Sequence, residues 1–270
     1  MSETTRALPG SAFTAVGGNV YRASELTRGP WHPEHQHAGP PIALTCRAVE
    51  AAAREHGLTH VSRITANLLR PVPIGELAVQ VEADYVGRNA GHFSAQLVAG
   101  DKEVARFTAL VQRETPLPLP DPPGVVVPDP PRMPEASPLC TFPFAGKHVG
   151  YGDLVQTRLA RGRFFDGPCA AWFRLCHPLL PGETPSDYQR VAVFADSGNG
   201  ISAALDFRKY VFVNSDLTVN LLRRPQGEWI CLDAHTHLGP SGCGLTASRL
   251  FDVNGLIGTA TQSLSIRLRE

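Results

Sequence analysis

Apolar and polar residues alternate along four consecutive stretches in the first half of the chain. These stretches are residues 61–70, 75–87, 91–100 and 104–113, and glycines or an Asp-Lys pair separate them. Alternation with a period of two places the apolar side chains on one face of a strand and the polar ones on the other. The pattern therefore predicts a set of antiparallel strands joined by short turns.

A different pattern precedes these strands, in the segment HQHAGPPIALTCRAVEAAAREHG at 35–57. Pro40 and Pro41 suit the first turn of a helix, the alanines favour its continuation, and Gly57 is a typical end. Residues 21–26 are expected to close an initial strand. The first half thus predicts a strand, one helix and about four antiparallel strands.

The second half repeats this order of elements. Residues 167–177 have the pattern of a strand, and Ser186 followed by Gln189 is the sequence of a capping box at a helix start. The helix is expected to end near residues 198–200. Strands then follow from Tyr210 to the end of the chain.

The two halves also share sequence. Residues 64–70 read ITANLLR and residues 217–223 read LTVNLLR, with five of seven positions identical. Each half closes with an alternating run and an arginine, at 105–113 and 258–267. A single repeat of this length indicates a duplicated unit rather than a solenoid array.

A proline-rich segment separates the halves, because ten of the 24 prolines lie between positions 116 and 138. Proline lacks a backbone N–H and fixes φ, so this segment cannot be a helix or a central strand. We interpret it as an extended linker over the surface. The predicted organisation is a first repeat at 1–113, a linker at 114–138 and a second repeat at 139–270.

Composition excludes several classes of protein. Lys and Arg number 25 and Asp and Glu number 25, so there is no electrostatic reason to propose nucleic acid or an anionic membrane as a partner. No apolar run approaches the ~20 residues that span a bilayer, and the first residues lack a signal pattern, so we expect a cytoplasmic protein. The six cysteines show no CxxC or zinc-site spacing and are expected to be free thiols.

One long helix lying on a curled antiparallel sheet is the hot-dog arrangement, and two copies in one chain predict an α+β double hot-dog. The chain resembles the TesB-like acyl-CoA thioesterase family over nearly its whole length. The order and spacing of the motifs carry the resemblance, rather than any single motif. The motifs lie at residues 37–44, 194–202, 214–225, 227–245 and 252–267. The resemblance implies hydrolysis of an acyl-CoA thioester to the free acid and CoA.

Thioester hydrolysis needs a positioned water, an acceptor for its proton and donors for the oxyanion. The family's catalytic set resembles an Asp, a Thr or Ser, and a Gln that together hold one water. Motif by motif these fall on Asp196, Ser215 and Gln262. Gln262 shares the apolar phase of its strand, so it needs hydrogen-bond partners. No metal or redox cofactor is implied.

The first repeat serves as an internal comparison. Ser62 matches Ser215, but Gln262 faces either Ala109 or Leu110, and the first helix has no comparable acid near its end. We therefore expect one competent site in each chain.

The first repeat still offers residues to that site. Free backbone N–H groups at the helix start near Gly39 could hold the oxyanion. This arrangement resembles that of hot-dog thioesterases, which place a backbone amide at the helix start against the thioester carbonyl. Gly39 could instead simply form a tight entry turn. His37 is a candidate substrate contact. Arg70, Arg223 and Arg224 end the matched strands and could meet the phosphates of CoA, or could be solvated strand ends.

Two alternatives remain open from the sequence. Hot-dog folds also host hydratases and dehydratases of 2-enoyl or 3-hydroxyacyl thioesters. The catalytic residues of these enzymes usually resemble a helix-borne Asp/His pair. His37 could be that histidine, but no acid lies in step with it along the chain. A module that binds acyl thioesters without turnover is the other alternative. Hot-dog units commonly associate, so a homodimer is a further expectation.

Overall fold

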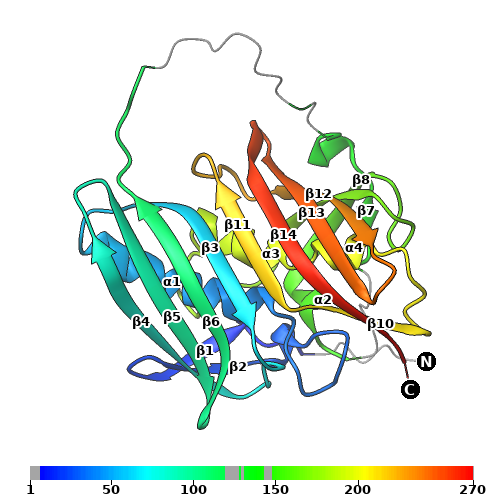
Figure 1. The fold of residues 1–270 in the computed structure, drawn as a ribbon, viewed down its shortest axis with the longest axis horizontal. Helices are drawn as coiled ribbons and strands as arrows, with labels where there is room; N and C mark the ends of the chain where they lie inside the picture. Colours follow the sequence, from blue (N-terminus) through cyan, green and yellow to red (C-terminus); the bar gives the residue numbers. More distant parts are fainter. Residues whose placement is uncertain (1–6, 119–127, 129–130, 143–147, 270) are drawn as a thin grey trace.

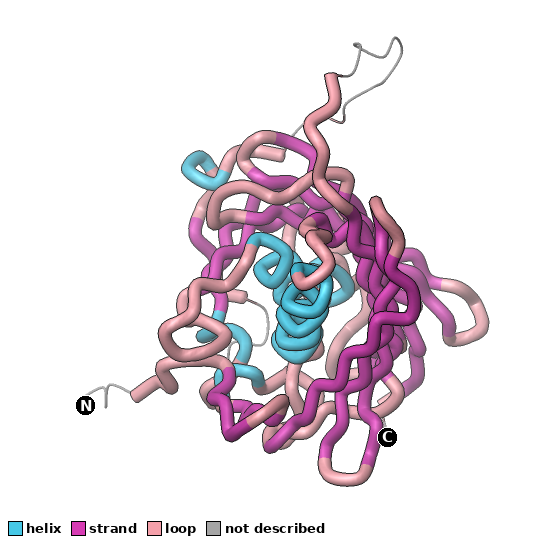
Figure 2. The backbone as a smooth tube through the Cα atoms, turned by 90° about the vertical axis from the view of Figure 1, so that its left-hand side faces the viewer, coloured by secondary structure: helices cyan, strands magenta, loops and turns pink. Residues whose placement is uncertain are grey.

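An antiparallel sheet of fourteen strands forms the outer layer of the molecule, and the helices lie within its curve (Figures 1 and 2). The computed structural model describes residues 7–118, 128, 131–142 and 148–269. The strands of the first half are β1 (Phe13–Gly17), β2 (Val20–Ala23), β3 (His60–Leu68), β4 (Glu76–Val86), β5 (Ala90–Ala99) and β6 (Lys102–Gln112). The second half contributes β7 (Leu139–Cys140), β8 (Val155–Arg161), β9 (Cys169–Leu175), β10 (Tyr210–Asn214), β11 (Asp216–Leu221), β12 (Ile230–Leu238), β13 (Cys243–Asp252) and β14 (Gly255–Leu268).

The two halves of the sheet join through β3 and β11. The strand order is β1-β2-β4-β5-β6-β3-β11-β14-β13-β12-β9-β8-β7, and β10 also pairs with β14. Thr65 lies opposite Thr218 in the β3–β11 register, and their hydroxyls are 3.1 Å apart. These are matched residues of the repeat, so the local two-fold axis passes between them. The predicted double hot-dog is confirmed.

The long helices α1 (Gly39–Arg54) and α3 (Asp187–Ala195) pack against each other in opposite directions. The start of α1 at Gly39 lies against Val193, near the end of α3. At the other end, Glu50 accepts hydrogen bonds of 2.8 Å from the side chains of Ser186 and Gln189. This packing brings the loop before α1 to the same place as the end of α3.

The alternating pattern of the strands places their apolar phase against the helices. In β6, for example, Phe107, Ala109 and Val111 are buried, whereas Arg106 and Thr108 are exposed. Burying large apolar side chains in this way stabilises the fold by about 1.5–3 kcal/mol each. The core is therefore the space between the two helices and the inner face of the sheet.

The predicted helix starts are close to those observed. The helix expected from Pro40 begins at Gly39, and the Ser186 hydroxyl caps α3 by accepting from the backbone N–H of Gln189 at 3.1 Å. The second helix was expected to end near residues 198–200, but α3 ends at Ala195 and a short helix, α4 (Gly198–Ile201), follows it. The short helix α2 (Tyr151–Leu154) was not predicted. Among the described residues, no helix is long and apolar enough to cross a membrane.

The end of the predicted linker packs on the outer face of the sheet. Residues 119–127 and 129–130 of that segment lie outside the described residues. The carbonyl of Arg132 accepts a hydrogen bond of 2.6 Å from the indole of Trp172 in β9, and that of Pro134 accepts one of 3.1 Å from Arg158 in β8. Trp172 belongs to a small apolar cluster separate from the main core, so this segment covers the face away from the helices.

Candidate active site

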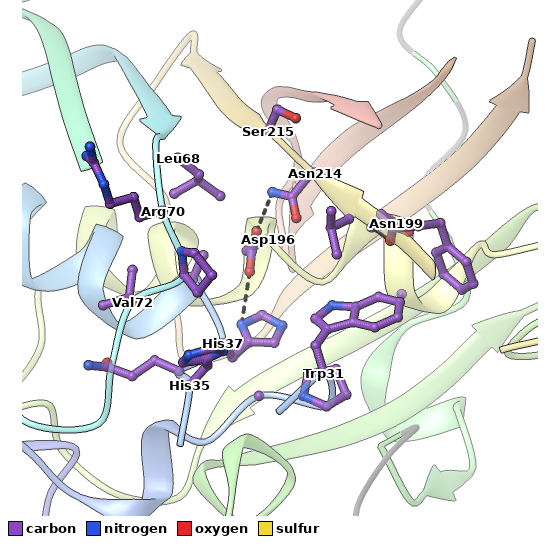
Figure 3. A pocket seen from close by; sticks show the side chains of 18 of the residues that line it. Trp31, His35, His37, Leu68, Arg70, Val72, Asp196, Asn199, Asn214 and Ser215 are labelled. Atoms are coloured by element: carbon purple, nitrogen blue, oxygen red, sulfur yellow. Dashed lines mark hydrogen bonds and ion pairs between the residues drawn. The ribbon is translucent and has the colours of Figure 1, made fainter. Parts of the chain in front are cut away.

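A pocket of about 290 Å³ opens where the loop before α1, the end of α3 and the junction of β10 and β11 meet (Figure 3). Both halves of the chain supply its walls. The lining residues are Gly29, Pro30, Trp31, His35, Gln36, His37, Ala38, Leu68, Leu69, Arg70, Pro71, Val72, Phe142, Asp196, Asn199, Gly200, Phe212, Val213, Asn214 and Ser215. Within the described part of the chain, no group of three or more His, Cys, Asp or Glu side chains is arranged to hold a metal ion.

A histidine and an aspartate from different repeats meet in this pocket. Nδ1 of His37 lies 3.1 Å from Oδ2 of Asp196, and their side chains are only 9% and 5% exposed. His37 precedes α1 and Asp196 is the C-terminal cap of α3, so the antiparallel packing of the helices creates the contact. No acid lies in step with His37 along the chain, and the structure supplies one from the other repeat instead.

Two amide side chains hold the aspartate. Asn214 donates from Nδ2 to Oδ1 of Asp196 at 2.8 Å. Gln262 donates from Nε2 to the Asp196 backbone carbonyl at 3.1 Å and to Oδ1 at 3.4 Å, and its own oxygen accepts from the backbone N–H of Asn199 at 2.9 Å. The buried Gln262 thus has the partners that its position on the apolar phase requires. The carboxylate is left with one fixed orientation toward His37.

The His37 ring is fixed by its surroundings as well. It stacks on Tyr151, with ring centroids 3.7 Å apart and planes 3° from parallel. The Tyr151 hydroxyl in turn donates to the Val193 carbonyl at 3.0 Å. Burial lowers the pKa of His37, and the charge of Asp196 opposes this shift. The imidazole is therefore neutral at neutral pH.

The carboxylate decides which nitrogen of His37 carries the proton. Nδ1 faces two groups with opposite demands, the Asp196 carboxylate at 3.1 Å, which can only accept, and the Gly39 backbone N–H at 3.2 Å, which can only donate. Charge-assisted interactions are the stronger ones, so we assign the proton to Nδ1, on the side of Asp196. Nε2 then carries the free lone pair, and the ring lines the pocket. The arrangement is an oriented general base at the pocket wall.

Asn214, rather than Ser215, occupies the place expected for the hydroxyl. Ser215 is exposed, and the view in Figure 3 shows its side chain on the far side of Asn214 from Asp196. Its backbone bonds to both neighbouring strands, through the Ser263 carbonyl at 2.9 Å and the Leu68 N–H at 2.9 Å. Ser215 borders the pocket, but the structure does not join it to Asp196 and Gln262.

The register of β14 explains this displacement. Asn214 pairs with Leu264 and Thr218 pairs with Thr261, so four residues on one strand span three on the other. Ser215 lies in the resulting bulge, where the alternation slips by one residue. Sequence reasoning missed Asn214 because a bulge leaves no trace in the alternation of side chains.

Arg223 and Arg224 lie away from the pocket, contrary to expectation. Both follow β11, whereas the pocket lies at the start of that strand. Arg223 forms two hydrogen bonds to Asp252, at 2.6 and 2.7 Å, and Arg224 lies over the ring of Tyr188, 5.5 Å from its centroid. The contacts of Arg223 and Arg224 are with neighbouring parts of the fold. Arg70 is the matched arginine that lines the pocket.

Gly39 has a packing role in the structure. A Cβ atom on Gly39 would lie 2.1 Å from the Val193 carbonyl oxygen, so only glycine permits this approach of the two helices. Its backbone N–H points at Nδ1 of His37, at 3.2 Å, and not into the pocket. This placement does not support the expected role as oxyanion donor.

The pairing of the strands identifies the counterparts of the site in the first repeat. Thr65 pairs with Thr108 as Thr218 pairs with Thr261. The residue that corresponds to Gln262 is therefore Ala109, and the one that corresponds to Asn214 is Val61. Neither can make the hydrogen bonds described above, which supports the prediction of one site in each chain.

Comparisons with protein families agree with this fold. The model of the acyl-CoA thioesterase N-terminal domain matches residues 27–112, and that of the acyl-CoA thioesterase C-terminal domain matches residues 126–266. The chain belongs to the acyl-CoA thioesterase family. It is a thioester hydrolase of the TesB-like type. A search of curated proteins found no match.

Solved structures share the whole architecture at low sequence identity. A hot-dog protein of unknown function from Alicyclobacillus acidocaldarius is 17% identical, with a TM-score of 0.74 and 97% of each chain covered. The tesB protein of Mycobacterium avium subs paratuberculosis is 15% identical, with a TM-score of 0.68 and coverage of 94% of this chain and 95% of that one. An acyl-CoA thioesterase II from Mycobacterium marinum is 16% identical, with a TM-score of 0.66 and 96% of each chain covered. These likenesses establish the double hot-dog fold.

Proposed function

We propose that this chain hydrolyses an acyl-CoA thioester to the free acid and CoA, with His37 and Asp196 activating the attacking water. The contact of 3.1 Å between these two residues, in a pocket walled by both repeats, is the observation that carries the proposal. The family of the chain supplies the reaction class.

The geometry supports the following sequence of steps. The Asp196 carboxylate accepts a hydrogen bond from Nδ1–H of His37, which stays protonated there, and so keeps the lone pair on Nε2 basic. Nε2 takes a proton from water while the water oxygen attacks the thioester carbonyl carbon, which gives a tetrahedral oxyanion. When the C–S bond breaks, the proton on Nε2 passes to the departing CoA sulfur. Asn214 and Gln262 keep the carboxylate in place throughout.

The polarity of the pocket supports one orientation of the substrate. Arg70 and Val72 lie on one side of the His37–Asp196 pair, and Trp31 lies on the other (Figure 3). The phosphates of CoA are anionic, so the CoA moiety belongs on the side of Arg70. The acyl group then extends toward Trp31.

A thiol-release assay on short, medium, long and aromatic acyl-CoAs tests the proposal. We expect turnover of at least one ester, and a loss of about 10²- to 10⁴-fold in Asp196→Ala, because the base loses its orienting partner. Asp101→Ala, in the exposed turn between β5 and β6, is the matched control and should retain activity. Turnover near the wild-type rate in Asp196→Ala would contradict the assignment.

The same pair of residues favours a second candidate reaction, the hydration of 2-enoyl thioesters or its reverse. A His/Asp pair facing an acyl pocket provides the acid and base that this reaction needs. Following the absorbance of a 2-enoyl-CoA together with thiol release separates the two. Loss of the enoyl signal without thiol release would identify the hydratase, and binding of intact esters alone would identify a binding module.

A further inference from the structure

Aromatic rings fill the core next to the pocket. Phe142 lines the pocket, is only 6% exposed and meets Phe173 edge-on, with ring centroids 5.9 Å apart. Phe173 in turn stacks on Phe194 of α3, with centroids 5.6 Å apart. Protein interiors are packed as densely as organic crystals, so these rings close the inward direction, between the helices and the sheet, to an acyl chain.

A second aromatic group bounds the pocket on the side where the acyl group is placed. Trp31 belongs to the loop before α1, and its ring lies beside the His37–Asp196 pair (Figure 3). The ring packs on two rings of the second repeat, that of Phe207 at 4.8 Å and that of Phe212 at 5.3 Å between centroids. A residue of the first repeat thus closes this side of the pocket by its contact with the second repeat.

We propose that Trp31 ends the acyl site and makes this chain a thioesterase of short acyl groups. The inference rests on the proposed function, which directs the acyl group toward Trp31. The pocket of about 290 Å³ is at the small end for ligand sites, and it also has to hold the thioester end of CoA. A short chain fits between His37 and Trp31, whereas a longer one would have to displace the indole ring.

Trp31 is also the part of this wall that can be removed with the least effect on the core. It is half-buried and lies outside the helices and strands, whereas Phe212 is 2% exposed and belongs to β10. Truncation of Trp31 therefore opens the acyl side of the pocket and leaves the sheet intact.

Butyryl-, octanoyl- and dodecanoyl-CoA test the proposal as a series of increasing chain length. In the wild type, kcat/KM should be at least about tenfold higher for butyryl-CoA than for dodecanoyl-CoA. In Trp31→Ala this ratio should fall about tenfold or more, through a rise for dodecanoyl-CoA, because the longer chain gains the space of the ring. A wild-type preference for dodecanoyl-CoA, or an unchanged ratio in Trp31→Ala, would overturn the proposal.

Two further variants assign the length limit to its residue. Trp229→Ala is the matched control and should keep the wild-type ratio. Trp229 is half-buried as well, but it packs on the apolar cluster of Trp172, with the Arg174 guanidinium 5.0 Å from its ring centroid. Trp31→Leu should shift the ratio in the same direction as Trp31→Ala by a smaller factor, so it decides the question if Trp31→Ala does not fold. An equal change at all chain lengths would place CoA against Trp31 and contradict the proposal.

The test separates this inference from the proposed function. S-butyl-CoA and S-dodecyl-CoA are thioethers that cannot be hydrolysed, so their affinities in calorimetry measure the same length preference without turnover. If no ester releases thiol, the proposed function fails, and the two affinities in the wild type and Trp31→Ala still test the acyl site. If esters are hydrolysed without a preference for short chains, only the length limit fails.

Discussion

His37 is held by three neighbours that leave its ring one orientation. Asp196 faces Nδ1 at 3.1 Å, Tyr151 stacks on one face, and Phe142 approaches edge-on with a centroid separation of 6.4 Å. An imidazole fixed in this way loses little entropy when it takes a proton from water. The precision of the site therefore comes from packing as much as from charge.

The pH dependence of activity follows from the burial of this ring. Burial lowers the pKa of His37 below its ordinary 6.5, although Asp196 opposes the shift. The basic form then persists to lower pH, so kcat/KM should be constant near neutrality and fall only as the pH drops below 6.5. A pH profile of thiol release checks this, and an acidic limb centred above 6.5 would contradict it.

Asn214 and Ser215 provide a direct test of which residue serves the site. Asn214→Ala removes a hydrogen bond to a buried carboxylate, so we expect kcat to fall by about 10- to 100-fold. Ser215→Ala removes only an exposed hydroxyl and should change kcat much less. Steady-state kinetics of the two variants decide the point, and the reverse order of effects would restore Ser215 to the site.

Asn214 and Ser215 also show which parts of the site could be predicted from the sequence and which could not. Asp196 and Gln262 were predicted from the motifs of the family resemblance, and the apolar phase of Gln262 within its strand supported that residue. Ser215 shares the phase of Leu217 and Val219, so a continuous strand would direct it inward. The bulge moves Asn214 into that position instead, and only the pairing with β14 reveals it.

Among the elements, the contact of α1 with α3 decides whether the site forms. Gly39→Ala would place a methyl group 2.1 Å from the Val193 carbonyl oxygen and force the helices apart. We expect a loss of about 1–3 kcal/mol in the free energy of unfolding, together with a fall in kcat as His37 moves from Asp196. Gly75→Ala, which has open space at its Cβ position, should change neither. Urea unfolding and kinetics of both variants check this prediction.

At the other end of the α1–α3 pair, the buried Glu50 affects how stability depends on pH. Burial raises the pKa of Glu50 above its ordinary 4.5, although hydrogen bonds from Gln189 and Ser186 oppose the shift. The folded state thus holds this proton more tightly than the unfolded state, so Glu50 lowers stability progressively as the pH rises from 4.5 through the raised pKa.

Glu50→Gln should remove that part of the pH dependence. The free energy of unfolding of the variant relative to the wild type should be lowest in acid and increase toward neutral pH, because only the wild type loses a proton. Urea unfolding at several pH values measures the difference. A difference that is constant with pH would contradict the role given to Glu50.

The whole molecule is a duplicated unit with one half specialised for chemistry. Val61 and Ala109 stand where the second repeat has Asn214 and Gln262. A non-hydrolysable thioether analogue of the preferred acyl-CoA should therefore bind with a stoichiometry of one per chain in calorimetry. Two equivalent sites per chain would contradict this. Association into a homodimer stays a prediction that analytical ultracentrifugation can test.

At this scale the sequence predicted the architecture but not the contacts across it. The repeat and the alternating strands were enough to predict two hot-dog units, because periodicity is a local property. The pairing of Thr65 with Thr218 and the direction of α3 along α1 depend on how the units dock. That is why Asp196 could be proposed from the sequence while its partnership with His37 could not.

The contact between His37 and Asp196 joins residues that each repeat supplies separately. A nascent chain that has released only its first repeat therefore carries no functional centre, however well that repeat has folded. During refolding from urea, the circular dichroism signal should return before thioester hydrolysis does. Enzymatic turnover thus reports the last step of assembly, the docking of one repeat on the other, and gives a kinetic probe of it that needs no label.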